Sequence, residues 1–462
     1  MGWLVFSGED GIDAIFDPEK NKSKKHRRDD ALIPFKTKVD KNRYEDFSGV
    51  VGAFSRLMSN TSIKGGVDMK LLYSEMKAKL EDCDDEDFDK LFHVAEDLYF
   101  SNGKLLPTNV KSLSYVDSNI TQQQVAEYLF SLFVTGTDLK DQYLLMEGEE
   151  DTNVLENLVF SSLDDAEKKD TGSIQNADCF LPYVKEVFGK DLTILMRNND
   201  SYKTYISRFL AYYYMFYVSQ LAVKLSKFDH GQRDEIEKIY LSLNWEVLTR
   251  VRPGYEYGWK LVKEAISHMF SHAVVLEMLS HNEDEYHLDY IGIYERMAKT
   301  EDDEAVAEDI NGICETYKNW IPLDYEKCKH DSQKDGDCKT SNAVRKLFET
   351  VDYQFINGGR ISHYNGYNKK FIEFAQKNFG KWRGTLGYSI GVSENDIVMF
   401  TQIILEEYQG KIRLSKLFDE FEKRGLLFDR ESKKKITDLY EKMNLLEKRS
   451  DSGDAQYVKS VL

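Results

Sequence analysis

The sequence has few of the residues and motifs that would assign a class of protein at once. Its 462 residues include six prolines and five cysteines, and five scattered thiols are too few for a disulfide framework. No run of 18 apolar residues occurs, so we expect no membrane span. The apolar start over residues 1–6 is too short for a secretory signal. We therefore expect a cytoplasmic protein with reduced thiols.

Motifs of the common enzyme classes are also missing. The chain has no G-x-x-x-x-G-K-[ST] loop, no G-x-G-x-x-G behind an apolar strand and no H-E-x-x-H. Its many acidic residues show no spacing typical of a nuclease metal site. The sequence therefore predicts a protein that is not an enzyme and needs no cofactor.

Two groups of residues have the chemistry of metal ligands. Glu264, His268 and His272 lie at i, i+4 and i+8, but core packing already explains that helix. Four further zinc-type ligands fall within 25 residues: Cys314, Cys328, His330 and Cys338. They lack a C-x₂-C pair, so we predict ordinary loop cysteines and leave zinc as the alternative.

Aromatic residues and amphipathic runs are abundant. With 28 Tyr and 26 Phe, the chain is expected to be a mostly α, multi-domain helical protein, since its length exceeds a single core. The predicted units are a basic arm (1–43), a helical domain (44–190), an aromatic-rich helical domain (191–340), a Gly/basic/aromatic connector (341–393) and a C-terminal winged helix-turn-helix (394–462).

Helical spacing predicts elements in the two helical domains. Leu91, Val94, Ala95 and Leu98 share one face of a helix. Further helices are expected over residues 232–248, 258–279 and 286–297. The stretch 202–227 is apolar nearly all round, which is typical of a buried core helix rather than a surface that stacks bases.

The charge is distributed unevenly along the chain. The net charge is −18 from 62 basic and 80 acidic residues. Residues 341–462 hold 21 basic and 17 acidic residues, a balance of +4, which leaves −22 for residues 1–340. The C-terminal quarter is therefore the one long segment whose charge does not disfavour contact with phosphates. We expect the acidic part to carry the contacts with protein partners.

The last residues have the order of a winged helix-turn-helix. An amphipathic stretch over 394–408 is followed by a β-like run at 412–414 and a helix that ends before Gly425. A second helix begins after Asp429 and is predicted to bury four residues: Ile436, Leu439, Tyr440 and Met443. Two β-like runs, 445–449 and 456–462, form the expected wing.

Such an order predicts a DNA-binding surface, because the second helix of the pair enters the major groove by its N-terminal end. The candidate contacts on this helix are Arg430, Lys433, Lys434, Lys435 and Thr437. Those on the wing are Lys448 and Arg449. A solvated helix face, or a winged helix that docks proteins, is the competing interpretation.

The connector offers a second group of candidates. Residues 341–390 hold eight basic and three acidic residues. The DNA-contact candidates there are Arg360, Lys381 and Arg383. Four aromatic residues alternate with the basic ones: Tyr364, Tyr367, Trp382 and Tyr388. Cations contact phosphates and rings stack on bases, although tight turns between helices explain the glycines equally well.

A family resemblance covers part of the chain. The stretch RGTLGYSIGVSENDIVMF at 383–400, together with the segment that ends in DSGDAQYVKS at 451–460, is similar to the C-terminal part of the DNA phosphorothioation-dependent restriction protein family DptG. FSGVVGAFSRL at 47–57 resembles it more weakly. The resemblance implies a subunit of a bacterial antiviral defence complex. Its partners would be two ATPase-type subunits, and the complex damages DNA that lacks backbone sulfur.

The sequence thus predicts a non-enzymatic subunit that holds ATPase or nuclease partners and contacts duplex DNA. Two alternatives remain at this point. The chain could be a metal-dependent nuclease subunit, or it could be a winged-helix transcription regulator, to which a segment of 340 residues with a net negative charge beside one winged helix fits poorly.

Overall fold

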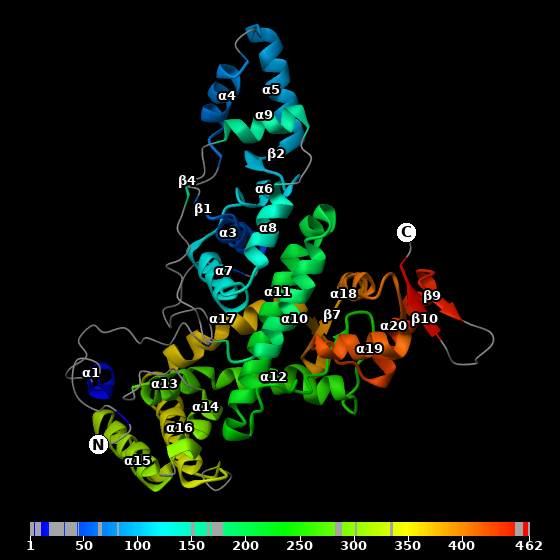
Figure 1. Ribbon diagram of the computed structural model, residues 1–462. Coiled ribbons are helices and arrows are strands. Elements are labelled where there is room, and N and C mark those ends of the chain that lie inside the picture. The colour runs from blue at the N-terminus through cyan, green and yellow to red at the C-terminus, as the bar shows by residue number, and fades with distance from the viewer. Residues whose placement is uncertain are drawn as a thin grey trace.

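In a computed structural model the chain is mostly helical, with 68% helix and 8% strand (Figure 1). This confirms the expected predominance of α-helix; the predicted domain boundaries remain predictions. The structure describes residues 4, 11–17, 32, 44, 46–62, 67–80, 83–148, 153–163, 167–168, 179–281, 289–300, 303–332, 336–448 and 456–460. No helix within these ranges is long and apolar enough to cross a membrane. The predicted basic arm lies mostly outside them, apart from α1 (Ile12–Phe16).

A lobe at the top of Figure 1 has a small core of its own. Its elements are α4 (Met69–Ala78), α5 (Asp85–Tyr99), β2 (Phe100–Ser101), β3 (Lys104–Leu105) and α9 (Val154–Ser162). The buried residues of α5 are Phe88, Phe92, Ala95 and Tyr99. The prediction is therefore confirmed for Ala95 and wrong for Val94 and Leu98, which are 49% and 55% exposed, because aromatic rings on the neighbouring face bury more area.

The long helix α11 (Asn199–Leu225) runs through the main core. Around it lie α3 (Ser48–Ser59), α6 (Val110–Leu113), α7 (Ile120–Phe133), α8 (Leu139–Gly148) and α10 (Pro182–Leu195); β1 (Thr61–Ser62) pairs with β4 (Glu167–Lys168). Tyr212, Tyr213 and Tyr214 are at most 1% exposed. The prediction that this aromatic helix is core is confirmed.

The lower part of the molecule contains the next helices in the chain. They are η2 (Phe228–His230), η3 (Tyr255–Lys260), α12 (Leu261–Ser267), α13 (Met269–Leu279), α14 (Tyr290–Thr300), α15 (Asp303–Trp320), η4 (Tyr325–Lys327), α16 (Lys339–Asn357) and α17 (Ile361–Phe379). The helix predicted over 232–248 does not form, and this segment contains β5 (Ser242–Leu243) instead. The side chain of Gln220 binds both the N–H (2.8 Å) and the C=O (3.1 Å) of Glu237, so a tertiary contact replaces helical hydrogen bonds there.

The C-terminal elements follow the predicted order. They are β6 (Gly380–Trp382), η6 (Gly384–Leu386), β7 (Tyr388–Val392), α18 (Glu394–Glu407), β8 (Lys411–Arg413), α19 (Leu414–Lys423), α20 (Arg430–Lys442), β9 (Leu446–Lys448) and β10 (Gln456–Lys459). One sheet has the order β5-β7-β6 and another β8-β10-β9. Ile436, Leu439 and Tyr440 are buried as predicted, whereas Met443, at the C-cap of α20, is 39% exposed.

Candidate nucleic-acid interface

The turn between α19 and α20 fixes how the C-terminal elements sit on the body. Gly425 has φ +75°, and a Cβ at this position would lie 2.1 Å from the Phe216 ring of α11. Only glycine combines that backbone conformation with so close an approach. The turn is thereby pressed against the central helix.

A buried arginine anchors the same turn. The Arg424 guanidinium, 2% exposed, donates hydrogen bonds to Asp191 of α10, with Nη2–Oδ1 at 2.7 Å and Nε–Oδ2 at 2.9 Å. Tyr212 donates to the Arg424 carbonyl at 2.7 Å, and Tyr213 donates to Asp191 at 2.6 Å. A bidentate pair with these additional hydrogen bonds holds α19 and α20 in one orientation.

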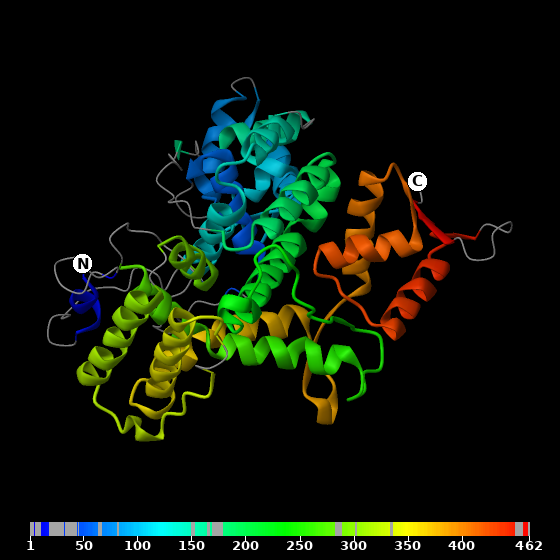
Figure 2. The same ribbon diagram turned by 60° about the horizontal axis from the view of Figure 1, so that its bottom comes forward.

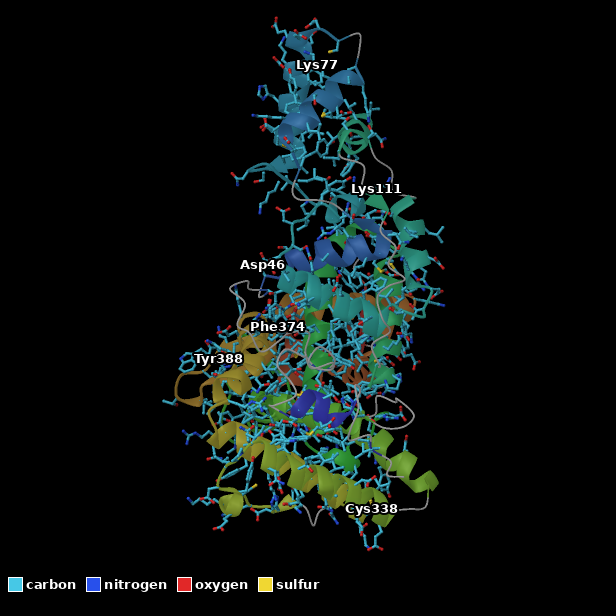
Figure 3. All side chains as sticks on the ribbon, turned by 90° about the vertical axis from the view of Figure 1, so that its left-hand side faces the viewer. Asp46, Lys77, Lys111, Cys338, Phe374 and Tyr388 are labelled. Carbon is cyan, nitrogen blue, oxygen red and sulfur yellow. The ribbon has the colours of Figure 1, made fainter. Side chains whose placement is uncertain are left out.

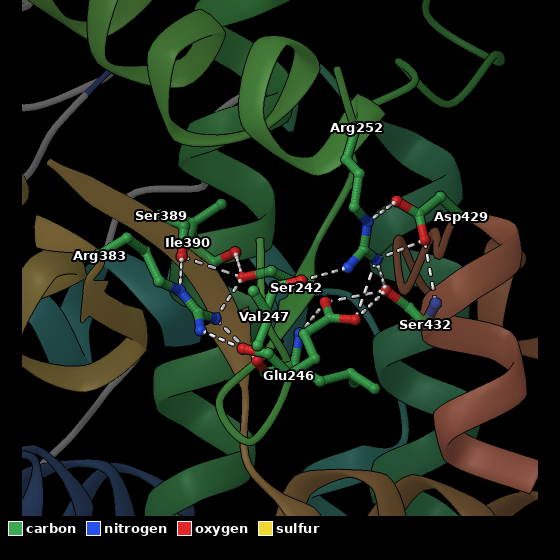
Figure 4. A network of polar contacts seen from close by, with 10 residues as sticks. Ser242, Glu246, Val247, Arg252, Arg383, Ser389, Ile390, Asp429 and Ser432 are labelled. Carbon is green, nitrogen blue, oxygen red and sulfur yellow. Dashed lines mark hydrogen bonds and ion pairs between the residues drawn. The ribbon is translucent and has the colours of Figure 1, made fainter. Parts of the chain in front are cut away.

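A second polar network holds the N-terminal end of α20 (Figure 4). Asp429 caps the helix by accepting a hydrogen bond from the Ser432 amide at 2.9 Å. Arg252 donates to Asp429 (2.6 Å), Glu246 (2.9 Å) and Ser432 (2.8 Å). Burial alone would raise the pKa of Asp429, but the Arg252 and Ser432 hydrogen bonds lower it below its ordinary value. The end of α20 that was predicted to enter a groove is therefore bonded to the segment 246–252.

The side of α20 faces outward instead. The orange and red elements of Figure 2 show α20 and its hairpin on the side of α19 that points away from α11. Arg430, Lys434 and Lys435 are exposed. Among the residues that the structure describes, these three cations have neither an ion pair nor a side-chain hydrogen bond. They are the cations near the start of α20 that can meet an anionic partner.

The other candidates of the C-terminal segment have internal partners. Lys433 bonds to Glu422 at 2.8 Å, and the Thr437 hydroxyl donates to the Lys433 carbonyl at 2.9 Å. Lys448 pairs with Glu441 at 2.6 Å. Arg449 and the predicted turn that follows lie outside the described residues. The structure therefore brings the candidates together on one side of the molecule, but it leaves fewer open cations than the sequence indicated.

The connector candidates separate into one open cation and two that are engaged. Lys381 is exposed on β6, whereas Arg360 lies over the Phe355 ring at 4.7 Å. Arg383 donates to the carbonyls of Glu246 (2.6 Å) and Leu243 (2.7 Å) and to two serine hydroxyls. Arg383 thus has a structural role, which leaves its donors little capacity for a phosphate, and its DNA contact stays a prediction.

The connector aromatics divide in the same way. Tyr364 and Tyr367 are buried in the core, at 5% and 0% exposure. Trp382 and Tyr388 are 61% and 39% exposed. Figure 3 shows Tyr388 at the edge of the molecule, well away from Lys77 on the N-terminal lobe. Only the second pair can meet a ligand.

Among the described residues, neither group of metal-type residues brings three ligand atoms within 4.8 Å of one another. His268 bonds to Asp352 at 3.0 Å, whereas His272 is buried and bonds to Tyr290 at 2.8 Å. Cys314 lies against Thr350, and Cys338 caps α16.

The sequence analysis missed one compact group: within the described ranges, ligand atoms of Asp229, His230 and Asp337 lie within 4.8 Å of one another. Arg345 pairs with Asp229 at 2.6 Å and supplies a positive charge there already, which disfavours a cation.

Among the described residues, exposed cations on α20 and β6 and exposed rings on the β6–β7 hairpin give this region groups that can bind a ligand. Comparison of the chain with models of known protein families and with curated proteins found no match.

Proposed function

We propose that the protein is a non-enzymatic subunit of a bacterial DNA phosphorothioation-dependent restriction complex, with a C-terminal winged helix that contacts duplex DNA. The observation that carries the DNA contact is the open cationic side of α20, formed by Arg430, Lys434 and Lys435. The order α18, β8, α19, α20, β9, β10, with β8 and the hairpin in one sheet, supports the winged helix. The proposed membership of a restriction complex rests on the family resemblance over about residues 380–462.

The contact would be made mainly with phosphates. The N-terminal end of α20 is bonded to Arg252 through Asp429, so the side of the helix, rather than its tip, approaches the duplex. The helix contains no Asn or Gln, which are the usual readers of adenine. Lysines that neutralise phosphates position a protein on DNA without reading sequence. We therefore expect weak binding with little sequence preference.

The acidic part of the chain would hold the ATPase-type subunits. Residues 68–99, which include α4 and α5, carry eleven acidic and four basic residues. On α5 the apolar side chains of Val94 and Leu98 are exposed among exposed acidic residues such as Glu96 and Asp97. An apolar stripe inside an acidic surface fits a basic, amphipathic partner surface.

The test of the DNA contact is a salt titration of duplex binding by the full chain. Lys434→Glu/Lys435→Glu should weaken binding to every sequence and reduce the slope of log K against log [salt] by about 2, because each phosphate that the protein neutralises adds ~0.9 to that slope. Lys70→Glu/Lys90→Glu is the matched control, because it changes the net charge equally at exposed sites on α4 and α5. Equal binding and equal slopes for all three proteins would contradict the proposal.

The proposal that the chain is not an enzyme has a separate test. The purified chain should neither hydrolyse ATP nor nick DNA with Mg²⁺ or Mn²⁺. Either activity, if it followed the chain through purification and survived removal of contaminants, would refute this part.

A further inference from the structure

A surface beside the N-terminal end of α20 exposes an unusual set of apolar side chains. Trp382 and Tyr388 of the β6–β7 hairpin are 61% and 39% exposed, and Val247 and Val251 of the neighbouring loop are 81% and 91% exposed. We call these four residues the hairpin surface. An exposed Trp beside other open apolar groups marks a binding surface more often than a solvated one.

The hairpin surface is held rigidly from beneath. Arg383 of the hairpin donates to the carbonyls of Glu246 and Leu243, and Arg252 donates to the carbonyl of Val247 at 2.8 Å. Figure 4 shows these bonds linking the hairpin, the loop and α20. A surface whose side chains are already positioned loses little entropy when a ligand binds.

The two rings are placed for stacking. Trp382 and Tyr388 are opposite each other in the β6–β7 register, with ring centroids 5.2 Å apart and ring planes at 69°. In this edge-to-face arrangement the edge of one ring contacts one face of the other, and the remaining ring faces are left open. A flat, exposed aromatic face matches the π-face of a nucleic-acid base.

The charge around the rings favours a nucleic acid over an acidic or neutral partner. Residues 374–393 contain no acidic side chain, in a chain whose net charge is −18. Lys381 precedes Trp382 on β6 and is exposed on the other face of the strand, where it pairs with Ser389. Arg250 in the loop is exposed, and Arg430 of α20 follows directly on the bonded Asp429. Cations beside an open aromatic pair are the combination that single-strand binding surfaces use.

We propose that the hairpin surface binds an unpaired DNA strand, with one base stacked on the Trp382–Tyr388 pair and phosphates on Lys381 and Arg250. Inside a duplex a paired base has both faces covered by its neighbours, so an unpaired strand offers Trp382 base faces that the interior of a duplex does not. The inference rests on the proposed DNA contact and adds a second mode to it. Duplex would lie on α20 and an adjacent single strand on the hairpin surface.

The experiment uses the full chain, with fluorescein-labelled oligothymidylate as the single-strand probe and a blunt duplex of mixed sequence as the second probe. Trp382→Ala should weaken oligothymidylate binding by about 5- to 150-fold, the loss expected for one base–aromatic stack. Trp382→Phe should restore most of the affinity, because it keeps a ring. Leu145→Ala, at an equally exposed position on α8 (66%), is the control and should change nothing. Circular dichroism checks that each variant folds.

The outcomes separate the two proposals. Loss of single-strand binding in Trp382→Ala, with duplex binding intact, supports the inference. Duplex binding by the wild type with no binding of oligothymidylate would overturn it and leave the proposed function standing. The reverse pattern would remove the α20 contact instead, and binding of neither probe would refute both. Equal oligothymidylate binding by wild type and Trp382→Ala would overturn the inference. So would loss of ATPase-type partners, with no change in DNA binding, in that variant.

Discussion

Arg424 should be the side chain on which the position of the C-terminal elements depends most. It lies 2% exposed against Asp191, which is fully buried, and also bonds to Glu420 and Glu407. Arg424→Met removes the cation but fills much of the same space. Glu420 keeps Lys423 (2.8 Å) and Glu407 keeps Lys190 (2.5 Å), so the uncompensated charge is concentrated on Asp191.

The cost follows from that charge. Breaking a buried ion pair by removing one partner destabilises a protein by about 3–5 kcal/mol, because the remaining ion is left unpaired. Arg424→Met/Asp191→Asn removes both charges and should recover most of the loss, so the two changes should be far from additive. Lys190→Met, at a half-exposed pair, should cost under about 1 kcal/mol and serves as the control.

Native-state hydrogen exchange measures this loss where it occurs. The amides of Gly425 and Leu426 bond to the carbonyls of Glu422 and Phe421, both at 2.9 Å, and their protection reports opening of the turn. In Arg424→Met the opening free energy should fall by about 3–5 kcal/mol. A loss below about 1 kcal/mol, or a double variant as unstable as the sum of the single ones, would refute the reasoning.

The pH dependence of the stability loss in Arg424→Met is a second test of the same ion pair. Burial raises the pKa of Asp191, and Arg424 lowers it, so without the arginine the pKa rises further above its unfolded value. A carboxyl group whose pKa is raised by folding does not destabilise the protein below its unfolded pKa of about 3.9, and it destabilises the protein most above its folded pKa. The loss of opening free energy in Arg424→Met, relative to the wild type, should therefore become smaller as pH falls from 8 towards 4.

Three further predictions concern other parts of the molecule. Burial and the nearby His268 lower the pKa of His272 to about 3, so as pH falls below about 6.5 this histidine is protonated in the unfolded chain before it is protonated in the folded one. His272→Phe should therefore remove about 2 kcal/mol of the stability that the protein loses between pH 7 and 5. Denaturation at both pH values measures this loss, and His93→Phe, at an exposed position, is the control. Gly425→Ala should lower the melting temperature more than Gly410→Ala does. Both have positive φ, but only the former would place a Cβ against Phe216. On α5, Val94→Arg/Leu98→Arg should reduce co-purification of the ATPase-type subunits, whereas Val154→Arg, 88% exposed on α9, should not; unchanged co-purification would remove this stripe from the partner contact.

The parts of the fold that sequence reasoning predicted are those whose signals are local. Asp429 is a good N-cap and Gly425 a good helix terminator in any context, so the α19–α20 pair could be placed. On α5 two apolar faces competed, and residue spacing alone could not show that Phe88 and Phe92 would define the core. The failed helix over 232–248 depended on Gln220, whose side chain binds the backbone at Glu237. No pattern within that window records such a contact.

The candidate site could be predicted only in part, for the same reason. The sequence does not show whether a basic side chain bonds to a group inside the protein or stays exposed to solvent. Arg383 looked like a phosphate contact because basic and aromatic residues surround it, but its donors are taken by carbonyls more than 130 positions earlier. Lys433 is paired by Glu422, from the preceding helix. Lys434 and Lys435 kept their predicted exposure because they lie on the side of α20 opposite Ile436 and Tyr440.

The internal network determines what the outside of this region can attract. Arg252 pairs with the carboxylates of Glu246 and Asp429, and Arg383 donates to the Glu246 carbonyl, so these four residues have no net charge. Paired buried charges contribute little field at a distance, because opposite signs lie within a few ångströms of each other. In the proposed DNA contact, the attraction would then come from exposed cations such as Arg430 and Lys434 on α20 and Lys381 on the hairpin. Since the same network bonds the hairpin, the loop and α20 together, a duplex on one and an unpaired strand on the other would be held at a fixed separation.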